Sequence, residues 1–289
     1  MILESELIVN PDGSIFHLCL KPGQVADTVI LVGDPKRVGV IGAYLSNVEF
    51  TVANREYVST TGFYNDTRIT VLSTGVGVGN IDIVLNELDA LVNIDFETRQ
   101  IKKGHKKLNL VRIGTSGSLQ RDILVNSYVL SEKSVGFDNL LHYYDQADTV
   151  INTDFSKVLK KAIAQDFSFF QPYVIDASKE LFDKLNSNLV HSGVTITSPG
   201  FYVPQGRKLR VNAAIENIND RLSEFEYNEV RITNYEMESA ALYGLARVLG
   251  HQAVAICLIA ANRFNKDANL NYREKMKTLI EYVLDNLTR

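Results

Sequence analysis

Two carboxylates stand together where a predicted strand meets a predicted helix, in the run Glu236-Met237-Glu238. The extended segment 230–233 precedes them, and the helix that follows keeps apolar residues at helical spacing until Gly250. In an extended or turn conformation, residues at positions i and i+2 can point to one side. A carboxylate accepts from two neighbouring hydroxyls, so Glu238, the better placed of the pair, could bind a vicinal diol such as a ribose. The alternative, equally compatible with the local sequence, is that both are helix N-terminal charges stabilised by the helix dipole.

A glycine turn with a nearby arginine follows the predicted strand 29–32. Gly33 comes directly after the strand, Asp34 is a predicted helix N-cap, and Pro35 occupies the first helical position. Free backbone N–H groups and the positive end of the helix dipole can bind an anion there, and Arg37 adds donors suited to phosphate oxygens. The Walker spacing GxxxxGK[ST] is missing, so this turn alone could also be a plain strand-to-helix connection.

Two further predicted strands run into glycines and small hydroxyl residues. The strand 68–74 is followed by glycines at alternate positions, but the GxGxG spacing lacks the dinucleotide fingerprint GxGxxG, so a Rossmann cofactor site is rejected. The strand 108–113 carries Arg112 and runs into Gly114 and Thr115. Arg112 needs an anionic partner, because burying an unpaired charge is costly. Open α/β sheets bind ligands at such carboxyl ends of their strands.

Other candidate groups lie in three different segments. The extended run 52–60 is expected to hold Arg55 within a strand, which usually marks a sheet edge or a subunit contact. The short arm 15–20 carries His17 beside apolar neighbours, a setting that is usually structural. The polar segment 95–107 is expected to be an insertion or a surface loop.

The loop 198–207 combines an aromatic ring, an amide and a guanidinium in Phe201, Gln205 and Arg207. An amide offers both a donor and an acceptor, and a guanidinium offers charge. The alternative is that they are ordinary loop residues.

The composition limits the class of protein. The chain has 289 residues, 45% of them hydrophobic and 22% charged, with no evident linker, so one α/β domain spanning 1–289 is predicted. A net charge of −4 without a long basic run argues against nucleic acid as a main partner. Cys19 and Cys257 lie in apolar runs and lack metal-ligand spacing. An acidic N-terminus and no apolar run near 20 residues long predict a cytoplasmic protein without a membrane partner.

In their order along the chain, these motifs resemble the nucleoside phosphorylase superfamily, and specifically the uridine phosphorylases, nearly from end to end. The landmarks are Phe16-His17-Leu18, Gly33-Asp34-Pro35-Lys36-Arg37, Arg55-Glu56, Ser73-Thr74-Gly75-Val76-Gly77, Arg112-Ile113-Gly114-Thr115-Ser116-Gly117, Phe201-Tyr202-Val203-Pro204-Gln205-Gly206-Arg207, Glu236-Met237-Glu238 and Asn262-Arg263. Each motif alone is weak, but the ordered set is specific.

The resemblance implies one α/β domain around a mixed, barrel-like sheet, with a homodimer as the building unit and active sites shared between subunits. It implies roles for the following residues: phosphate binding by Gly33, Arg37, Arg112 and Thr115, with Arg55 from the neighbouring subunit; ribose binding by Met237 and Glu238, with Glu236 nearby and the His17 of a partner copy; and base binding by Phe201, Gln205, Arg207 and Arg263. The chain departs from bacterial hexameric members at segment 95–107 and at Asn80, where many carry serine near an intersubunit potassium site, so the resemblance leaves open both the choice between dimer and hexamer and the binding of the ion.

The implied reaction is attack of inorganic phosphate on ribose C1′ while the glycosidic bond breaks. Glu238 and the phosphate held by Arg112 would stabilise the oxocarbenium-like sugar, and Gln205 and Arg207 the departing base, as preorganised electrostatics without a metal or organic cofactor. The base is expected to be a pyrimidine, because resembling purine enzymes carry an aspartate at or beside position 261, where this chain has Ala260-Ala261-Asn262-Arg263. The alternatives are a purine nucleoside phosphorylase of the same superfamily and a noncatalytic nucleoside-binding protein.

Overall fold

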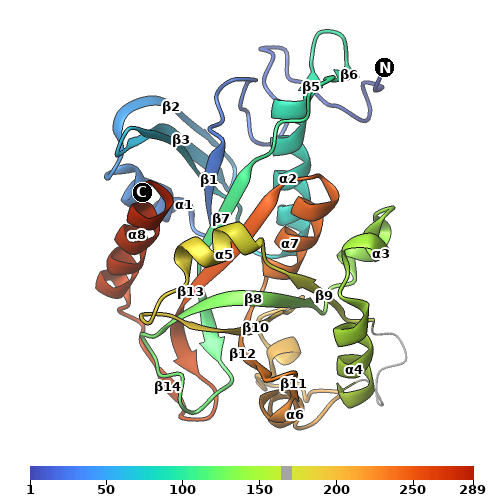
Figure 1. Ribbon diagram of the computed structural model, residues 1–289, viewed down its shortest axis with the longest axis vertical. Coiled ribbons are helices and arrows are strands. Elements are labelled where there is room, and N and C mark those ends of the chain that lie inside the picture. The colour runs from blue at the N-terminus through green and yellow to red at the C-terminus, as the bar shows by residue number, and fades with distance from the viewer. Residues whose placement is uncertain (164–170) are drawn as a thin grey trace.

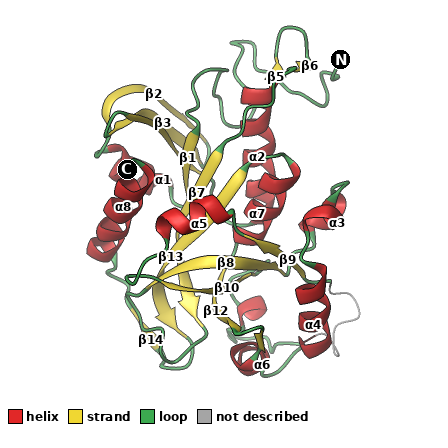
Figure 2. Cartoon of the chain, in the orientation of Figure 1, coloured by secondary structure: helices red, strands yellow, loops and turns green. Residues whose placement is uncertain are grey.

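Strands rich in β-branched residues form one large sheet at the centre of the molecule (Figures 1 and 2). The computed structural model describes residues 1–163 and 171–289. The sheet contains β1 (Thr28–Val32), β2 (Ser46–Asn54), β3 (Tyr57–Tyr64), β4 (Thr67–Ser73), β7 (Asn109–Ser118), β8 (Tyr128–Gly136), β9 (Tyr173–Asp176), β10 (His191–Thr197), β11 (Glu226–Tyr227), β12 (Val230–Glu236), β13 (Gln252–Asn262) and β14 (Asp267–Ala268).

Five of these strands close into a barrel. β7 pairs with β13, β13 with β8, β8 with β10, β10 with β12, and β12 pairs back with β7. The β13–β8 and β12–β7 pairs are antiparallel and the other three are parallel, so the barrel is mixed. The expected single α/β domain with a mixed, barrel-like sheet is confirmed.

Helices cover this sheet on its outer faces (Figure 2). They are α1 (Pro35–Gly42), α2 (Val78–Asn93), α3 (Ala147–Val150), α4 (Thr153–Ile163), α5 (Lys179–Leu185), α6 (Ile218–Glu224), α7 (Ser239–Val248) and α8 (Arg273–Leu287), with 3-10 turns at Leu140–Tyr143 and Val203–Gln205. The helix α7 packs against α2 and against strands of the barrel, which explains why residues such as Leu242 and Leu245 are fully buried. The predicted cap of α1 is confirmed, since the Asp34 side chain accepts from the Lys36 N–H at 2.9 Å.

The strand predicted to end at Ile113 continues as β7 to Ser118. Its extension closes the barrel, because Gly117 and Ser118 pair with β12 on one side and with β13 on the other. Gly114 lies inside the strand, and a Cβ at that position would come within 3.0 Å of the Cys257 sulfur. The glycines therefore serve close packing inside a strand as well as access to a ligand, which local sequence did not reveal.

Two other expectations need correction. Arg55 and Glu56 do not lie within a strand; they form the turn between β2 and β3, where Arg55 has a left-handed backbone with φ +51°. The segment 95–107 lies at the surface but is structured. It forms part of a small hairpin of β5 (Ile94–Asp95) and β6 (Gln100–Ile101), beside the N-terminus in Figure 1. Its far end is held by a hydrogen bond of 2.7 Å from the Lys106 N–H to Asn93 Oδ1.

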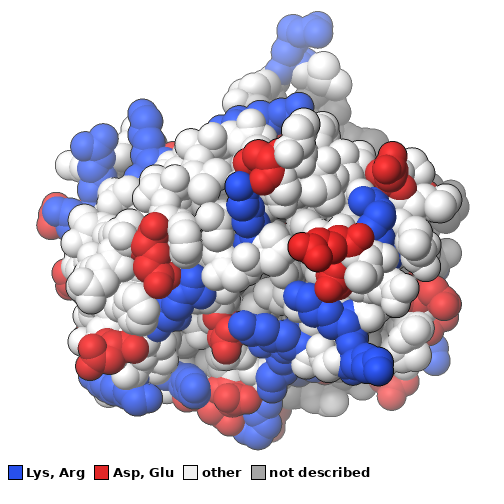
Figure 3. Space-filling view, turned by 90° about the horizontal axis from the view of Figure 1, so that it is seen from above, with Lys and Arg blue, Asp and Glu red and all other residues white. Residues whose placement is uncertain are grey.

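The surface carries both signs of charge. On the face seen from above, Lys and Arg side chains alternate with Asp and Glu (Figure 3). None of the helices in the described ranges combines the length and the apolar character needed to cross a membrane.

Candidate active site

A cavity of about 990 Å³ opens at the carboxyl ends of β1, β7 and β12. It brings together residues from across the chain, and these include the following predicted site residues: Gly33, Arg37, Arg112, Thr115, Phe201, Gln205, Arg207, Glu236, Met237, Glu238 and Arg263. Among the described residues, His17 and Arg55 do not line this cavity.

Glu236 holds the junction between β12 and α7 in place. Its carboxylate accepts from the backbone N–H groups of Glu238 and Ser239 at 2.9 Å, from the Ser239 hydroxyl at 2.7 Å and from the Thr197 hydroxyl at 2.6 Å. Glu236 therefore acts as a charge at the N-terminus of α7, as one of the two interpretations of the sequence expected. Its effect on a ligand is to fix the backbone that presents Glu238.

Glu238 has a different environment, although it is only two residues away. Its carboxylate accepts from the Gly77 N–H at 2.8 Å and forms a close ion pair with the Arg112 guanidinium. Both side chains are 5% exposed. Burial raises the pKa of the Glu238 carboxyl, Arg112 opposes that rise, and Glu236 adds to it. The attraction of Glu238 and Glu236 outweighs burial at Arg112 and raises the pKa of its guanidinium, which stays charged.

Arg112 has donors that make no hydrogen bond to the described residues, although its Nε also forms an ion pair with Glu236, at 3.7 Å from Oε2. Its Nε and Nη1 atoms are buried and have no hydrogen-bond partner within the described ranges. Gly33 lies beside the guanidinium, since a Cβ there would be 3.8 Å from Arg112 Nη2. Arg37 points to the same region, with Nη1 donating to the Ile113 carbonyl at 3.3 Å, and burial lowers the pKa of its guanidinium. Because unsatisfied buried donors are costly, these two cations could bind an anion.

Gln205 lies between two guanidinium groups that also line the cavity. Its Oε1 accepts from Arg207 Nη1 at 2.7 Å and from Arg263 Nη2 at 2.9 Å, and the residue is 3% exposed. The Arg207 guanidinium stacks on the Phe201 ring at 3.6 Å from its centroid. Burial, followed by repulsion from Arg263, lowers the pKa of Arg207 to about 10, so the side chain is still protonated at neutral pH.

Tyr235 is a site residue that the sequence analysis did not select. It lines the cavity and is 1% exposed, yet its hydroxyl has no hydrogen-bond partner among the described residues. Arg263 Nε is equally unpartnered there. A signal existed in the sequence, because Tyr235 directly precedes Glu236, but an aromatic residue in an apolar strand is ordinarily part of the core.

The predicted residues outside the cavity lie at one corner of the molecule. The Asn54 side chain donates to the His17 carbonyl at 2.8 Å, and Arg55 follows Asn54 in the exposed turn. His17 and Arg55 are therefore neighbours in space, although the chain separates them.

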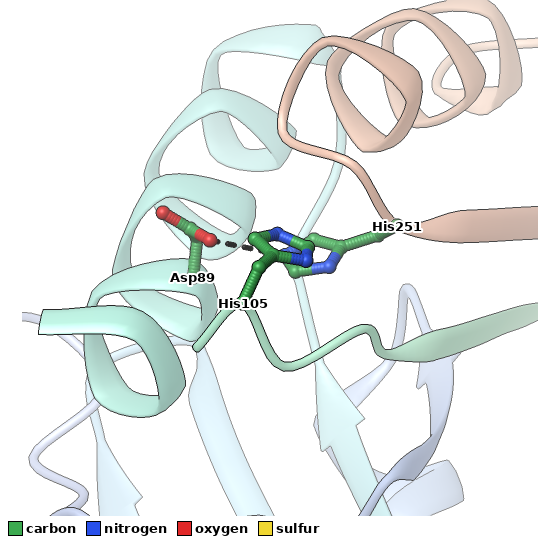
Figure 4. Close-up of side chains that lie close together, drawn as sticks. All are labelled: Asp89, His105 and His251. Atoms are coloured by element: carbon green, nitrogen blue, oxygen red, sulfur yellow. Dashed lines mark ion pairs between the residues drawn. The ribbon is translucent and has the colours of Figure 1, made fainter. Parts of the chain in front are cut away.

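Asp89, His105 and His251 form a cluster that could be taken for a metal site, with possible ligand atoms within 4.8 Å of one another (Figure 4). However, His251 Nδ1 accepts from the Leu108 N–H at 3.2 Å, which leaves the ring proton on Nε2, 3.4 Å from Asp89 Oδ1. A histidine that binds a metal through one nitrogen ordinarily donates through the other. His251 lacks that arrangement, so we interpret the cluster as a structural contact that joins α2, the segment before β7 and the start of β13.

The fold and the cavity define the class of protein. The structure matches a crystal structure described as Trypanosoma brucei nucleoside phosphorylase that shows uridine phosphorylase activity, with a TM-score of 0.88, 28% identity, and coverage of 97% of this chain and 99% of that chain. The closed five-stranded barrel is thus that of the nucleoside phosphorylase fold. The sequence-family model of the phosphorylase superfamily matches residues 27–286, and the chain belongs to that superfamily.

Two relatives differ in the base that their names specify. The chain is 28% identical over 279 residues to a uridine phosphorylase of Thermococcus kodakarensis, covering 94% of this chain and 88% of that protein. It is also 28% identical over 268 residues to a DeoD-type purine nucleoside phosphorylase of Streptococcus suis, covering 92% and 94%. Overall identity therefore does not distinguish a pyrimidine from a purine substrate.

Proposed function

We propose that this protein cleaves uridine, or a closely related pyrimidine nucleoside, with inorganic phosphate to give uracil and ribose 1-phosphate. Phosphate is the co-substrate, and the proposed chemistry uses no metal or organic cofactor. The proposal assigns one function to each of three sides of the cavity.

The phosphate side is supported by Arg112 and Arg37. Arg112 has two buried nitrogens, Nε and Nη1, that make no hydrogen bond to the described residues, and the backbone at Gly33 leaves room beside its guanidinium. A phosphate dianion would satisfy these donors and would balance the two cations. A noncatalytic nucleoside-binding protein would not need such a site, which argues against that alternative.

The ribose side is supported by Glu238. Its carboxylate is held by the Gly77 N–H and Arg112, and Glu236 fixes the backbone behind it. A carboxylate in this position can accept from the ribose hydroxyls while its charge stabilises the positive C1′ that develops as the glycosidic bond breaks. Phosphate bound at Arg112 would attack that carbon from the same region of the cavity.

The base side carries the choice of a pyrimidine. The decisive observation is that Gln205 is buried between Arg207 and Arg263. Uracil presents O2, N3–H and O4 in a row, which an amide between two guanidinium groups can match. Arg207 would also stabilise the negative charge that develops on uracil as the bond breaks.

A purine nucleoside remains the second candidate, because an aspartate does line the cavity. Asp267 on β14 is paired in register with Asn262 and is exposed at the cavity rim. A purine reaction would need a group of this kind near N7 of the base. Asp267 is the residue to remove when the two substrates are compared.

We also propose that the active site is shared between two copies of the chain. His17 and Arg55 lie in segments joined by the hydrogen bond from Asn54 to His17, outside the cavity of their own copy. A partner copy that placed this corner over the cavity would add a cation beside the phosphate and a histidine beside the 5′ end of the ribose.

The experiment is a comparison of kcat/KM for uridine, deoxyuridine, thymidine, inosine and adenosine with phosphate, with the released base identified by chromatography. Uridine should exceed inosine by about 10⁴, because a site built to hydrogen-bond its substrate rejects molecules that leave buried polar groups unpaired. Equal cleavage of inosine would contradict the pyrimidine assignment. Loss of that inosine activity in Asp267→Asn would then support the purine assignment.

A further inference from the structure

Glu87 on α2 holds the N-terminal arm through three groups at once. Its carboxylate accepts from the backbone N–H of His17 at 3.0 Å and from that of Leu18 at 2.8 Å. The same carboxylate lies 2.6 Å from His17 Nδ1. The Glu87 side chain is only 12% exposed, so its side of the contact is largely shielded from water.

This contact fixes the tautomer of His17. An ionised carboxylate only accepts hydrogen bonds, so the nitrogen facing it must carry a proton. In the neutral ring, Nδ1 is therefore the donor and Nε2 keeps its lone pair. The Tyr57 ring packs edge-on against the imidazole, with 6.2 Å between the ring centroids. The His17 side chain is 26% exposed, so its imidazole is oriented but still accessible.

The arm is also fixed relative to the corner that carries Arg55. Asn54 donates to the His17 carbonyl, which ties the arm to the end of β2. Glu87 and Asn54 together hold the backbone on both sides of the imidazole. These contacts hold the imidazole in one orientation at the exposed end of β2.

We propose that Glu87 is a positioning residue that keeps the proton of His17 on Nδ1, so that Nε2 accepts a hydrogen bond from the 5′-hydroxyl of a nucleoside bound to a second copy of the chain. This inference rests on the proposed function and on the shared site. It makes the 5′ position selective for a hydrogen-bond donor. A 5′-phosphate, which offers mainly acceptor oxygens and negative charge, would be opposed by the Nε2 lone pair and by the nearby Glu87 charge.

The first test reads the tautomer without any need for activity. The unaltered protein, labelled with ¹⁵N-histidine, is studied by NMR at pH 8.5, where a histidine is ordinarily neutral. The His17 signals are assigned by their absence in His17→Gln. We expect the proton on Nδ1, whereas a proton on Nε2, or protons on both nitrogens, would overturn the proposal.

The second test uses substrates that differ only at the 5′ position. One substrate is 5′-amino-5′-deoxyuridine, which can donate a hydrogen bond, and the other is 5′-deoxyuridine, which has no polar group at that position. The ratio of their kcat/KM values measures how much a hydrogen bond to Nε2 contributes. In Glu87→Gln the amide can donate to Nδ1 and move the ring proton to Nε2, so the ratio should fall about tenfold. Glu97→Gln, which alters an exposed glutamate, is the matched control and should leave the ratio unchanged.

A double mutant separates an effect through His17 from a direct effect of charge or of arm packing. If Glu87 acts through the imidazole, adding Glu87→Gln to His17→Phe should change the ratio no further. An unchanged ratio in Glu87→Gln alone, or an equal fall in the His17→Phe background, would contradict the proposal. If the protein does not cleave uridine at all, the proposed function fails, while the NMR measurement still decides the role of Glu87.

Discussion

Arg112 and Glu238 form a buried ion pair between the side of the cavity assigned to phosphate and the side assigned to ribose. Each residue is therefore the other's partner as well as a candidate ligand contact. A phosphate that bound the Nε and Nη1 donors of Arg112, which make no hydrogen bond to the described residues, would draw charge away from Glu238 without breaking the pair. The carboxylate would then be more available to the ribose, so phosphate and nucleoside should favour each other's binding.

The first prediction is that Arg112→Ala nearly abolishes phosphorolysis. The change removes the anion site and leaves the buried Glu238 carboxylate without its cation. Removing one member of a buried charged pair costs about 2–5 kcal/mol, which corresponds to roughly a 30- to 5,000-fold loss in kcat/KM. Arg247→Ala removes an exposed arginine of α7 and is the matched control. If kcat/KM with saturating phosphate stays within twofold of the original value, Arg112 does not bind phosphate.

The second prediction concerns the acidic side of the pH–rate profile. Burial raises the pKa of Glu238 above the ordinary value of 4.5, so protonation on lowering the pH should begin earlier than for an exposed glutamate. Protonated Glu238 lacks the negative charge that stabilises the oxocarbenium-like sugar, so kcat should fall as the pH falls through this raised pKa. Glu238→Gln should be slow at all pH values and should keep only the limb that belongs to phosphate itself. An identical acidic limb in Glu238→Gln would show that another group titrates.

The third prediction is complementation between two inactive variants. One variant carries His17→Ala and Arg55→Ala, and the other carries Glu238→Gln and Arg207→Ala. If sites are shared, dissociation and reassociation of a mixture should restore activity, because some sites then combine intact residues from both copies. Sedimentation should report a dimer or a larger assembly. A fully active monomer would be incompatible with shared sites.

The fourth prediction tests Tyr235, whose hydroxyl is buried and unpartnered among the described residues. If this hydroxyl contacts the base, Tyr235→Phe should lower kcat/KM for uridine about tenfold, the size of one hydrogen bond. The melting temperature should not fall, since the change removes an unsatisfied buried group and keeps the ring. A large loss of stability with unchanged kinetics would instead assign Tyr235 to the core.

The gathering of several motifs in one cavity could be predicted from the sequence because each motif is local. The cap at Asp34 and the carboxylates after β12 are set by neighbours in the chain, and the cavity contains both regions as expected. The local sequence could not predict that Glu236 binds backbone N–H groups whereas Glu238 pairs with Arg112. This difference depends on Thr197 and Arg112, which are distant in sequence and are brought close by barrel closure.

The errors in the predicted elements have similar causes. Arg55 sits among strand-forming residues, and its place in a turn follows from the antiparallel register of β2 and β3, which a single strand's sequence does not specify. The glycines after Ile113 resembled the end of a strand, yet pairing with β12 and β13 extends β7 through them. Tyr235 was overlooked because the unsatisfied state of its hydroxyl is a property of the assembled cavity.

The most direct test of the central claim is to follow uridine by ¹H and ³¹P NMR in one tube, with and without inorganic phosphate. The proposed function predicts uracil and ribose 1-phosphate in equal amounts when phosphate is present, and almost no uracil when it is absent. Arg112→Ala should abolish both products under the same conditions. Release of uracil with free ribose at the same rate in the absence of phosphate would contradict phosphorolysis and would identify a hydrolase instead.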